Sequence, residues 1–242
     1  MPVEGQNSKL VELSSKFDLY YNNISSNQAP GLVEYEKSVF LTNAQEDIVL
    51  SLYNGRNVSG ESFEETEELR RYLSNLIVED NLSLLTNTSG SHIGMEGSNS
   101  YFFSLPDGSE EGKPAVWHIT YESVNVNAGE GKCGGNKQIE VVPIRQDEYH
   151  KLKHNPFRGL NDRKAFRLDL ADNVVEIVSK YPVNSYYLRY LKRPYPIILE
   201  NLTDELNING YTEAREPLDV SEFLHQRIIE AAVELALKSW KS

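Results

Sequence analysis

The stretch SVNVNAGEGKCGGNKQIEVV (residues 123–142) decides between two classes of fold. Its centre, Gly129-x-Gly131-x-x-Gly134, has the glycine spacing of a dinucleotide-binding loop. Such a loop follows a strand and opens a helix, whose N-terminus faces the pyrophosphate. The residues after this loop, KQIEVV, are instead alternating and rich in β-branched side chains, so they predict a second strand. The stretch therefore predicts a β-hairpin with residues 129–135 at its tip, and no βαβ unit.

The region around this hairpin, from about residue 80 to residue 215, is rich in short β-type segments. These segments are apolar or alternating and are separated by turn-forming residues, which is typical of strands. A short helix or turn is expected at residues 145–159, where Asn155-Pro156 ends it. The predicted strands cover residues 100–106, 115–126, 137–144, 165–170, 174–181, 185–192 and 196–201.

Both ends of the chain show the three- and four-residue apolar spacing of amphipathic helices. Helices are predicted at residues 9–24, 32–55, 63–77 and 221–240. Asn54-Gly55 is a helix stop signal, and Ser221 is a suitable N-cap. The sequence thus predicts an α+β fold, in which a helical layer packs beside an antiparallel, β-rich middle region. The expected parts are a helical region at 1–80, a β-rich region at 81–215 and a C-terminal helix at 216–242 that forms one structural unit with 1–80.

The composition is that of an ordinary globular chain with a large negative charge. The 242 residues are 39% hydrophobic and 25% charged, and the net charge is −12. A chain this acidic is a poor nucleic-acid binder, because phosphate contacts need a surplus of Lys and Arg. Cys133 is the single cysteine, so no intrachain disulfide can form, and we expect an inert thiol. With no signal peptide and no window near about 18 consecutive apolar residues, we expect an intracellular protein without a membrane span.

Two features leave a nucleotide- or metal-dependent enzyme open as an alternative. The first is the glycine-rich loop 129–135 as a phosphate site, and the second is the pair His150 and His154, whose helical spacing could hold a metal. A zinc hydrolase of that type has Glu after the first histidine, where this chain has Lys151. We therefore favour a turn and surface histidines, and we expect no catalytic residue, no cofactor and no metal.

Four stretches, taken in order, resemble one known family. Their most specific part is Tyr190-Leu191-Lys192-Arg193-Pro194, followed by a helix that ends in Trp240. The set resembles the head-to-tail connector (ring or adaptor) proteins of tailed bacteriophages, above all those of crAss-like phages, over roughly residues 10–240. The four stretches are NQAPGLVEYEKSVFLTNAQEDIVLSLYNG (27–55), VVPIRQDEYHKLKHNPFRG (141–159), YYLRYLKRPYPIIL (186–199) and LHQRIIEAAVELALKSW (224–240).

The resemblance implies a structural protein of the virion and not an enzyme. Such proteins form a ring, commonly of twelve copies, that joins the capsid portal to the tail and surrounds the DNA channel. The implied partners are further copies of the chain, the portal protein, adjacent tail or ring proteins and passing DNA without sequence-specific contact. The implied location is the head–tail neck, after assembly in the cytoplasm of the host bacterium. A generic phage binding or attachment module is the remaining alternative.

In this family the end of the chain often docks onto the portal or a neighbouring ring. The C-terminal helix is therefore a candidate interface. The tyrosine-rich segment with the basic pair at residues 192–193 is a second candidate, since such a segment can stack nucleic-acid bases, although in so acidic a chain we favour a tyrosine-rich strand with a basic end. The alternative for the helix is that Trp240 and its apolar face pack into the core of their own subunit. The candidate interface residues are Phe223, Leu224, Ile228, Leu235, Trp240, Tyr190, Lys192 and Arg193.

Overall fold

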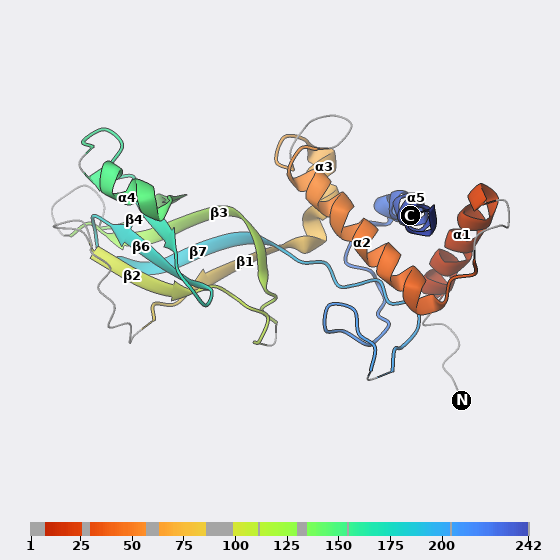
Figure 1. The fold of residues 1–242 in the computed structure, drawn as a ribbon. Coiled ribbons are helices and arrows are strands. Elements are labelled where there is room, and N and C mark those ends of the chain that lie inside the picture. Colours follow the sequence, from red (N-terminus) through yellow and green to blue (C-terminus); the bar gives the residue numbers. More distant parts are fainter. Residues whose placement is uncertain are drawn as a thin grey trace. The chain divides into compact units, whose positions relative to one another are not determined.

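The chain divides into two compact units, one helical and one built on a sheet (Figure 1). The first combines residues 1–76 with residues 194–242, and the second comprises residues 77–193. The predicted α+β class is confirmed. The computed structural model describes residues 8–25, 30–56, 63–85, 99–110, 112–129, 135–153, 155–203 and 205–241.

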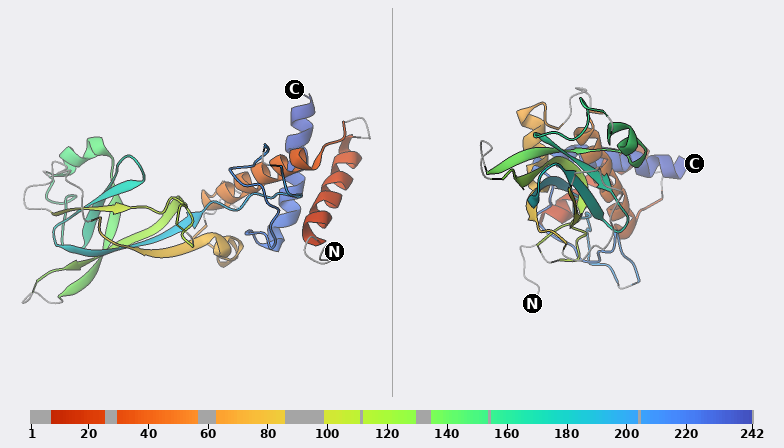
Figure 2. Two further views of the ribbon diagram at one scale, coloured as in Figure 1. Left: turned by 90° about the horizontal axis from the view of Figure 1, so that it is seen from below. Right: turned by 90° about the vertical axis from the view of Figure 1, so that its left-hand side faces the viewer.

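The helical unit contains α1 (Ser8–Ser25), α2 (Glu34–Tyr53), α3 (Glu67–Leu73) with the 3₁₀ turn η1 (Ser74–Leu76), and α5 (Glu222–Lys241). Helix α5 packs against both α1 and α2, as two further views show (Figure 2). The apolar stripes predicted for these three helices meet where α5 packs on α1 and α2, and such tertiary packing of an apolar face supplies most of the stability of helices in proteins. The buried side chains of these three helices include Leu10, Leu13, Phe17, Leu41, Val49, Leu52, Leu224, Ile228 and Val233.

The ends of two helices follow local sequence signals. Helix α2 stops at Asn54-Gly55 as predicted: Gly55 has φ +68°, and the Arg56 N–H donates to the Ser51 carbonyl at 2.9 Å, which closes a Schellman motif. Helix α3 begins at Glu67 and not at residue 63, because the Thr66 side chain accepts from the Leu69 N–H at 3.3 Å and caps it there.

The second unit is a seven-stranded sheet in the order β1-β7-β3-β4-β5-β6-β2. Every neighbouring pair is antiparallel except β4 and β5, which are parallel. The expectation of a wholly antiparallel region was therefore wrong for this pair. Parallel neighbours need a crossover connection, and α4 (Gln146–Lys153) lies in it. The strands are β1 (Ile77–Leu82), β2 (Asn99–Ser104), β3 (Val116–Asn127), β4 (Asn136–Pro143), β5 (Lys164–Asp169), β6 (Val174–Ser179) and β7 (Val183–Lys192).

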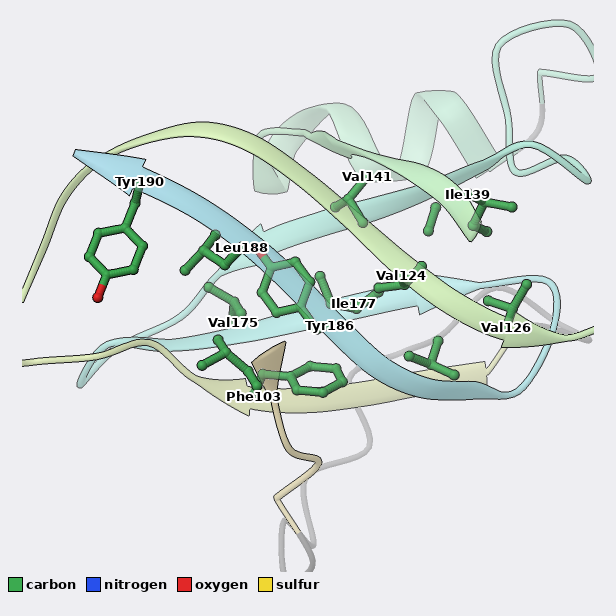
Figure 3. Close-up of a cluster of buried hydrophobic side chains, with 13 residues drawn as sticks. Phe103, Val124, Val126, Ile139, Val141, Val175, Ile177, Tyr186, Leu188 and Tyr190 are labelled. Carbon is green, nitrogen blue, oxygen red and sulfur yellow. The ribbon is translucent and has the colours of Figure 1, made fainter. Parts of the chain in front are cut away.

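The sheet curls around its own core (Figure 3). Phe103 on β2 and Tyr186 on β7 come from strands far apart in the sheet order, yet their ring centroids lie 5.2 Å apart. The inner face buries alternate residues of β3, β4, β6 and β7, as a strand period of two requires. On the other face, Tyr149 of α4 packs over Phe166, Leu168 and Val178 in a smaller core. The curl therefore gives the unit an enclosed core without a second sheet.

Two predicted elements differ from the structure. Ile77 was expected to end the helix predicted at residues 63–77, but it starts β1 and pairs with Leu191 of β7. Residues 196–201 were expected to form a strand, but they are not in the sheet. Pro194 and Pro196 lack the N–H groups that a ladder needs, so the chain leaves the sheet there and joins the helical unit.

Candidate interaction surfaces

The glycine-rich loop connects two paired strands. Asn127 of β3 lies opposite Asn136 of β4, and the Ala128 N–H donates to the Gly135 carbonyl at 2.8 Å. Gly129 has φ +82°, a conformation that favours glycine. The predicted hairpin is therefore confirmed, and the loop does not open a helix. Residues 130–134, with Cys133, lie outside the described residues.

The two histidines considered as metal ligands belong to α4 and the residue just after it. His150 is exposed on α4, and His154 lies outside the described residues. Within the part of the chain that the structure describes, no group of three or more His, Cys, Asp or Glu side chains could hold a metal ion. Of the described helices, none is long and apolar enough to cross a membrane.

The candidate interface residues of α5 fall on two sides of the helix. Leu224 and Ile228 are buried in the core with α1 and α2, and Leu235 is half-buried. Phe223 is 79% exposed and Trp240 is 43% exposed. The apolar stripe of α5 is thus used within its own subunit, while Phe223 and Trp240 remain accessible to a partner.

The candidate residues at the end of β7 also differ in exposure to solvent. Tyr190 is buried inside the curled sheet, where its hydroxyl donates to the Pro114 carbonyl at 2.8 Å. Burial raises the pKa of Tyr190 to about 12. Lys192 is half-buried and Arg193 is exposed. Tyr190 therefore belongs to the core, and only the basic pair reaches the surface.

Phe223 forms part of a groove with α3, which we call the Phe223 groove. The rings of Phe223 and Tyr72 lie 6.1 Å apart at an angle of 41°. The Tyr72 hydroxyl donates to the Glu68 carboxylate, and this bond raises the Tyr72 pKa. The groove has a volume of about 520 Å³ and is lined by Glu67, Glu68, Arg71, Tyr72, Ser221 and Phe223.

The contribution of α3 to this groove was not predicted. The sequence does contain a signal for it, because Tyr72 falls off the apolar stripe formed by Leu69, Leu73 and Leu76. A large aromatic side chain off the buried stripe of a helix is a candidate contact residue. Its partner Phe223 comes from the other end of the chain, and only the fold brings the two together.

A second exposed aromatic side chain lies in the turn after α4, residues 155–159, which we call the Phe157 turn. Phe157 is 92% exposed. The Asn155 side chain accepts from the N–H groups of Phe157 and Arg158 at 2.9 and 3.0 Å, so the turn is held by its own hydrogen bonds. The sequence predicted a helix stop at this place but did not single out Phe157.

A buried charged cluster lies inside the sheet unit. Arg167 Nη1 donates to Glu122 Oε1 at 2.8 Å, and the Tyr186 hydroxyl donates to Glu122 Oε2 at 2.6 Å. Burial raises the pKa values of Glu122 and Tyr186, although the nearby guanidinium opposes both shifts. The cluster joins β3, β5 and β7 and is enclosed by the core, so we assign it a structural role in holding the strand register.

Comparisons with known proteins cover almost the whole chain. The model of the family "phage tail ring protein 3/4" matches residues 9–242. Ring protein 3 of Bacteroides phage crAss001 is 39% identical over 229 residues, which is 94% of each chain. Ring protein 4/5 of the same phage is 34% identical over 239 residues, covering 95% of this chain and 92% of that protein.

Proposed function

Because the chain belongs to the phage tail ring protein 3/4 family, we propose that its copies assemble into a ring that connects the capsid portal to the tail. The chain is a crAss-like phage ring protein, and its role is structural. The observation that carries the proposal is the 39% identity to Ring protein 3 along 94% of both chains. A match of that length includes both units of the fold and is not confined to one of them.

A ring of identical subunits needs two different contact surfaces on each copy. In a head-to-tail interface one surface of a subunit meets a different surface of the next, and the ring closes when the rotation per subunit divides the circle. The Phe223 groove on the helical unit and the Phe157 turn on the sheet unit are two such surfaces. Both expose large aromatic side chains, which are enriched among the residues that dominate binding energy at interfaces.

The proposed ring has twelve copies, lies in the head–tail neck of the virion and is assembled in the host cytoplasm. Its partners are the portal protein, adjacent tail or ring proteins and the DNA that passes through the channel. The net charge of −12 supports passage without adhesion, since like charges repel within a Debye length of about 8 Å at physiological ionic strength. We propose Trp240, Lys192 and Arg193 as further contact residues toward neighbouring neck proteins, because all three reach the surface.

Cryo-electron microscopy of virions from the source phage tests this function. The expected result is density for twelve copies of the chain below the portal, with the axial channel open to DNA. A chain that is present in the virion but outside the neck would contradict the connector role and favour an attachment module. The same map would contradict the proposal of electrostatic repulsion if mainly Lys and Arg faced the channel.

We also propose that the protein is not an enzyme. A thermal-shift assay of the purified protein with nucleotides and divalent metal ions tests the alternative of a nucleotide- or metal-dependent enzyme. A ligand at 100 times its Kd would stabilise the fold by about 2.7 kcal/mol. We expect no shift with any of them, and a reproducible shift with one nucleotide or metal would reopen the loop 129–135 or the pair His150 and His154 as a site.

A further inference from the structure

The two most exposed large apolar side chains of the described residues are both phenylalanines. Phe157 is 92% exposed and Phe223 is 79% exposed. They lie in different units, on the Phe157 turn and in the Phe223 groove. An aromatic side chain left in water on a well-ordered element indicates a contact surface more strongly than a scattered exposed aliphatic residue.

The Phe157 turn is rigid enough to serve as an anchor. Asn155 holds the backbone of Phe157 and Arg158, and the Gly159 N–H donates to the Asn155 carbonyl at 2.8 Å. A Cβ atom on Gly159 would lie 2.7 Å from that carbonyl oxygen, so the turn requires glycine there. A backbone that is already held in one conformation loses little conformational entropy on binding.

The Phe223 groove has the shape and chemistry to receive such an anchor. Its aromatic part is the tilted pair of Tyr72 and Phe223, and its volume of about 520 Å³ lies in the range of roughly 300–1,000 Å³ found for binding pockets. Its rim carries Glu67 and Glu68, with Arg71 bound to Glu67 at 2.6 Å. The Glu68 carboxylate accepts the hydrogen bond of the Tyr72 hydroxyl and remains an acidic group at the rim.

Charge distinguishes the partner for this groove. Residues 63–72 (FEETEELRRY) carry four acidic and two basic residues, whereas residues 150–164 (HKLKHNPFRGLNDRK) carry five basic residues and one acidic. In a chain of net charge −12, two copies repel each other unless a basic region of one meets an acidic region of the next. The turn and the groove are complementary in aromatic character and in charge. The turn has an aromatic side chain next to Arg158, and the groove has aromatic side chains next to Glu68.

We propose that the Phe157 turn of one subunit docks into the Phe223 groove of the next copy of the chain. The inference rests on the proposed ring and names its subunit contact. Phe157 packs against Tyr72 and Phe223, and Arg158 pairs with Glu68. Turn and groove are different surfaces of the same chain, so the contact is head-to-tail, as a closed ring requires.

A charge exchange between two variants tests the pairing. Arg158→Glu alone and Glu68→Arg alone each place like charges at every contact, so each should weaken self-association at least about tenfold in sedimentation velocity. An equal mixture of the two variants restores opposite charges at every contact when the copies alternate, and it should assemble within about threefold of the wild type. Lys113→Glu, which makes the same charge change at another exposed site of the sheet unit, should assemble like the wild type.

The contact itself is tested by photo-crosslinking at high protein concentration, which detects it even if the free chain is mainly monomeric. The probe is p-benzoylphenylalanine in place of Phe157, in a mixture of ¹⁴N- and ¹⁵N-labelled protein. We expect intermolecular crosslinks to residues 67–72 and 221–223. The matched control has the same probe in place of Tyr121, an exposed aromatic residue of β3, and should not crosslink there.

The results separate this inference from the proposed function. The docking of the Phe157 turn would be overturned by crosslinks within one chain, by crosslinks to other residues or by the absence of crosslinks. This holds even if virions contain the ring. Equal assembly of Arg158→Glu and the wild type would overturn it in the same way. Absence of the chain from the virion neck would instead contradict the ring itself.

Discussion

Three polar side chains of α2 take the place of a neighbouring strand for residues 195–199. Thr42 Oγ1 accepts from the Ile197 N–H at 3.1 Å, and Ser38 Oγ accepts from the Leu199 N–H at 3.0 Å. One turn further along, Gln45 Nε2 donates to the Tyr195 carbonyl at 3.1 Å. The spacing of these residues puts them on one face of the helix, so three backbone groups of a segment outside the sheet still have hydrogen-bond partners.

Thr42→Val should lower the free energy of unfolding of the helical unit by about 1–3 kcal/mol. The change keeps the shape of the side chain but leaves the Ile197 N–H buried without an acceptor. Urea unfolding followed by circular dichroism measures the loss. Thr42→Ser, which keeps the hydroxyl, is the matched control and should lose less. Equal losses in the two variants would show that the hydrogen bond is not the cause.

His225 of α5 should make the stability of the helical unit dependent on pH. Burial lowers the pKa of His225 below its ordinary value of 6.5, despite the neighbouring Glu222 and Glu12. The unfolded chain therefore binds a proton in a range where the folded chain does not, and stability falls as the pH drops below about 6.5. His225→Gln should flatten the decrease between about pH 7 and pH 5, measured by urea unfolding. An unchanged slope in this variant would rule out His225 as the cause.

At the scale of elements, α5 shows how far an apolar periodic pattern predicts which side chains of a helix are buried and which are exposed. Its apolar stripe predicted a buried face, and Leu224, Ile228 and Val233 confirm one. The same stripe did not reveal that Phe223, next to Leu224, points into a groove with α3. Periodicity places side chains around a helix, but the neighbouring elements decide which of them are covered.

Truncations of α5 separate its core from its exposed end. Ala236 and Leu237 are buried, whereas Trp240 is only partly covered. Removing residues 236–242 should therefore cost about 2–5 kcal/mol more than removing residues 238–242, since only the longer truncation deletes a buried leucine. Chemical unfolding of the two truncated proteins gives the comparison. If both lose the same stability, Trp240 and its neighbours contribute the packing, and Trp240 is a poor candidate for docking to a partner.

At the scale of the whole molecule, the chain consists of a sheet unit inserted into a helical unit. The sheet unit is continuous in sequence and has its own core, with Phe103, Val124 and Tyr186 at its centre. Its first and last strands, β1 and β7, are neighbours, and Ile77 pairs with Leu191. The chain thus enters and leaves this unit at adjacent positions, an arrangement that tolerates insertion and excision.

Residues 77–193 should therefore fold when expressed alone. We expect a β-type circular dichroism spectrum and a cooperative thermal transition. The complementary variant joins Leu76 to Pro194 through a short Gly/Ser linker and should keep its helical spectrum. Two fragments that remain unfolded would show that each unit depends on the other, and the full chain would then unfold in a single transition.

The sequence by itself determined the local structure and the class of fold. Apolar periodicity located α1, α2, α5 and six of the seven strands, and the lack of a helix after the loop 129–135 predicted a hairpin and not a nucleotide site. These features depend on neighbours a few residues apart, so they can be read from the order of the residues. Four ordered stretches also indicated the phage ring protein family, which the comparisons show.

Only the tertiary structure decided which surfaces are covered and which are free. The curl of the sheet buries Tyr190, the α2 side chains bind residues 195–199, and α3 meets Phe223 to form the groove. The parallel pairing of β4 and β5 was likewise decided only by the tertiary structure. Each of these depends on contacts between residues distant in the sequence, and the free energy of such contacts is set by packing and desolvation at the final positions of both partners.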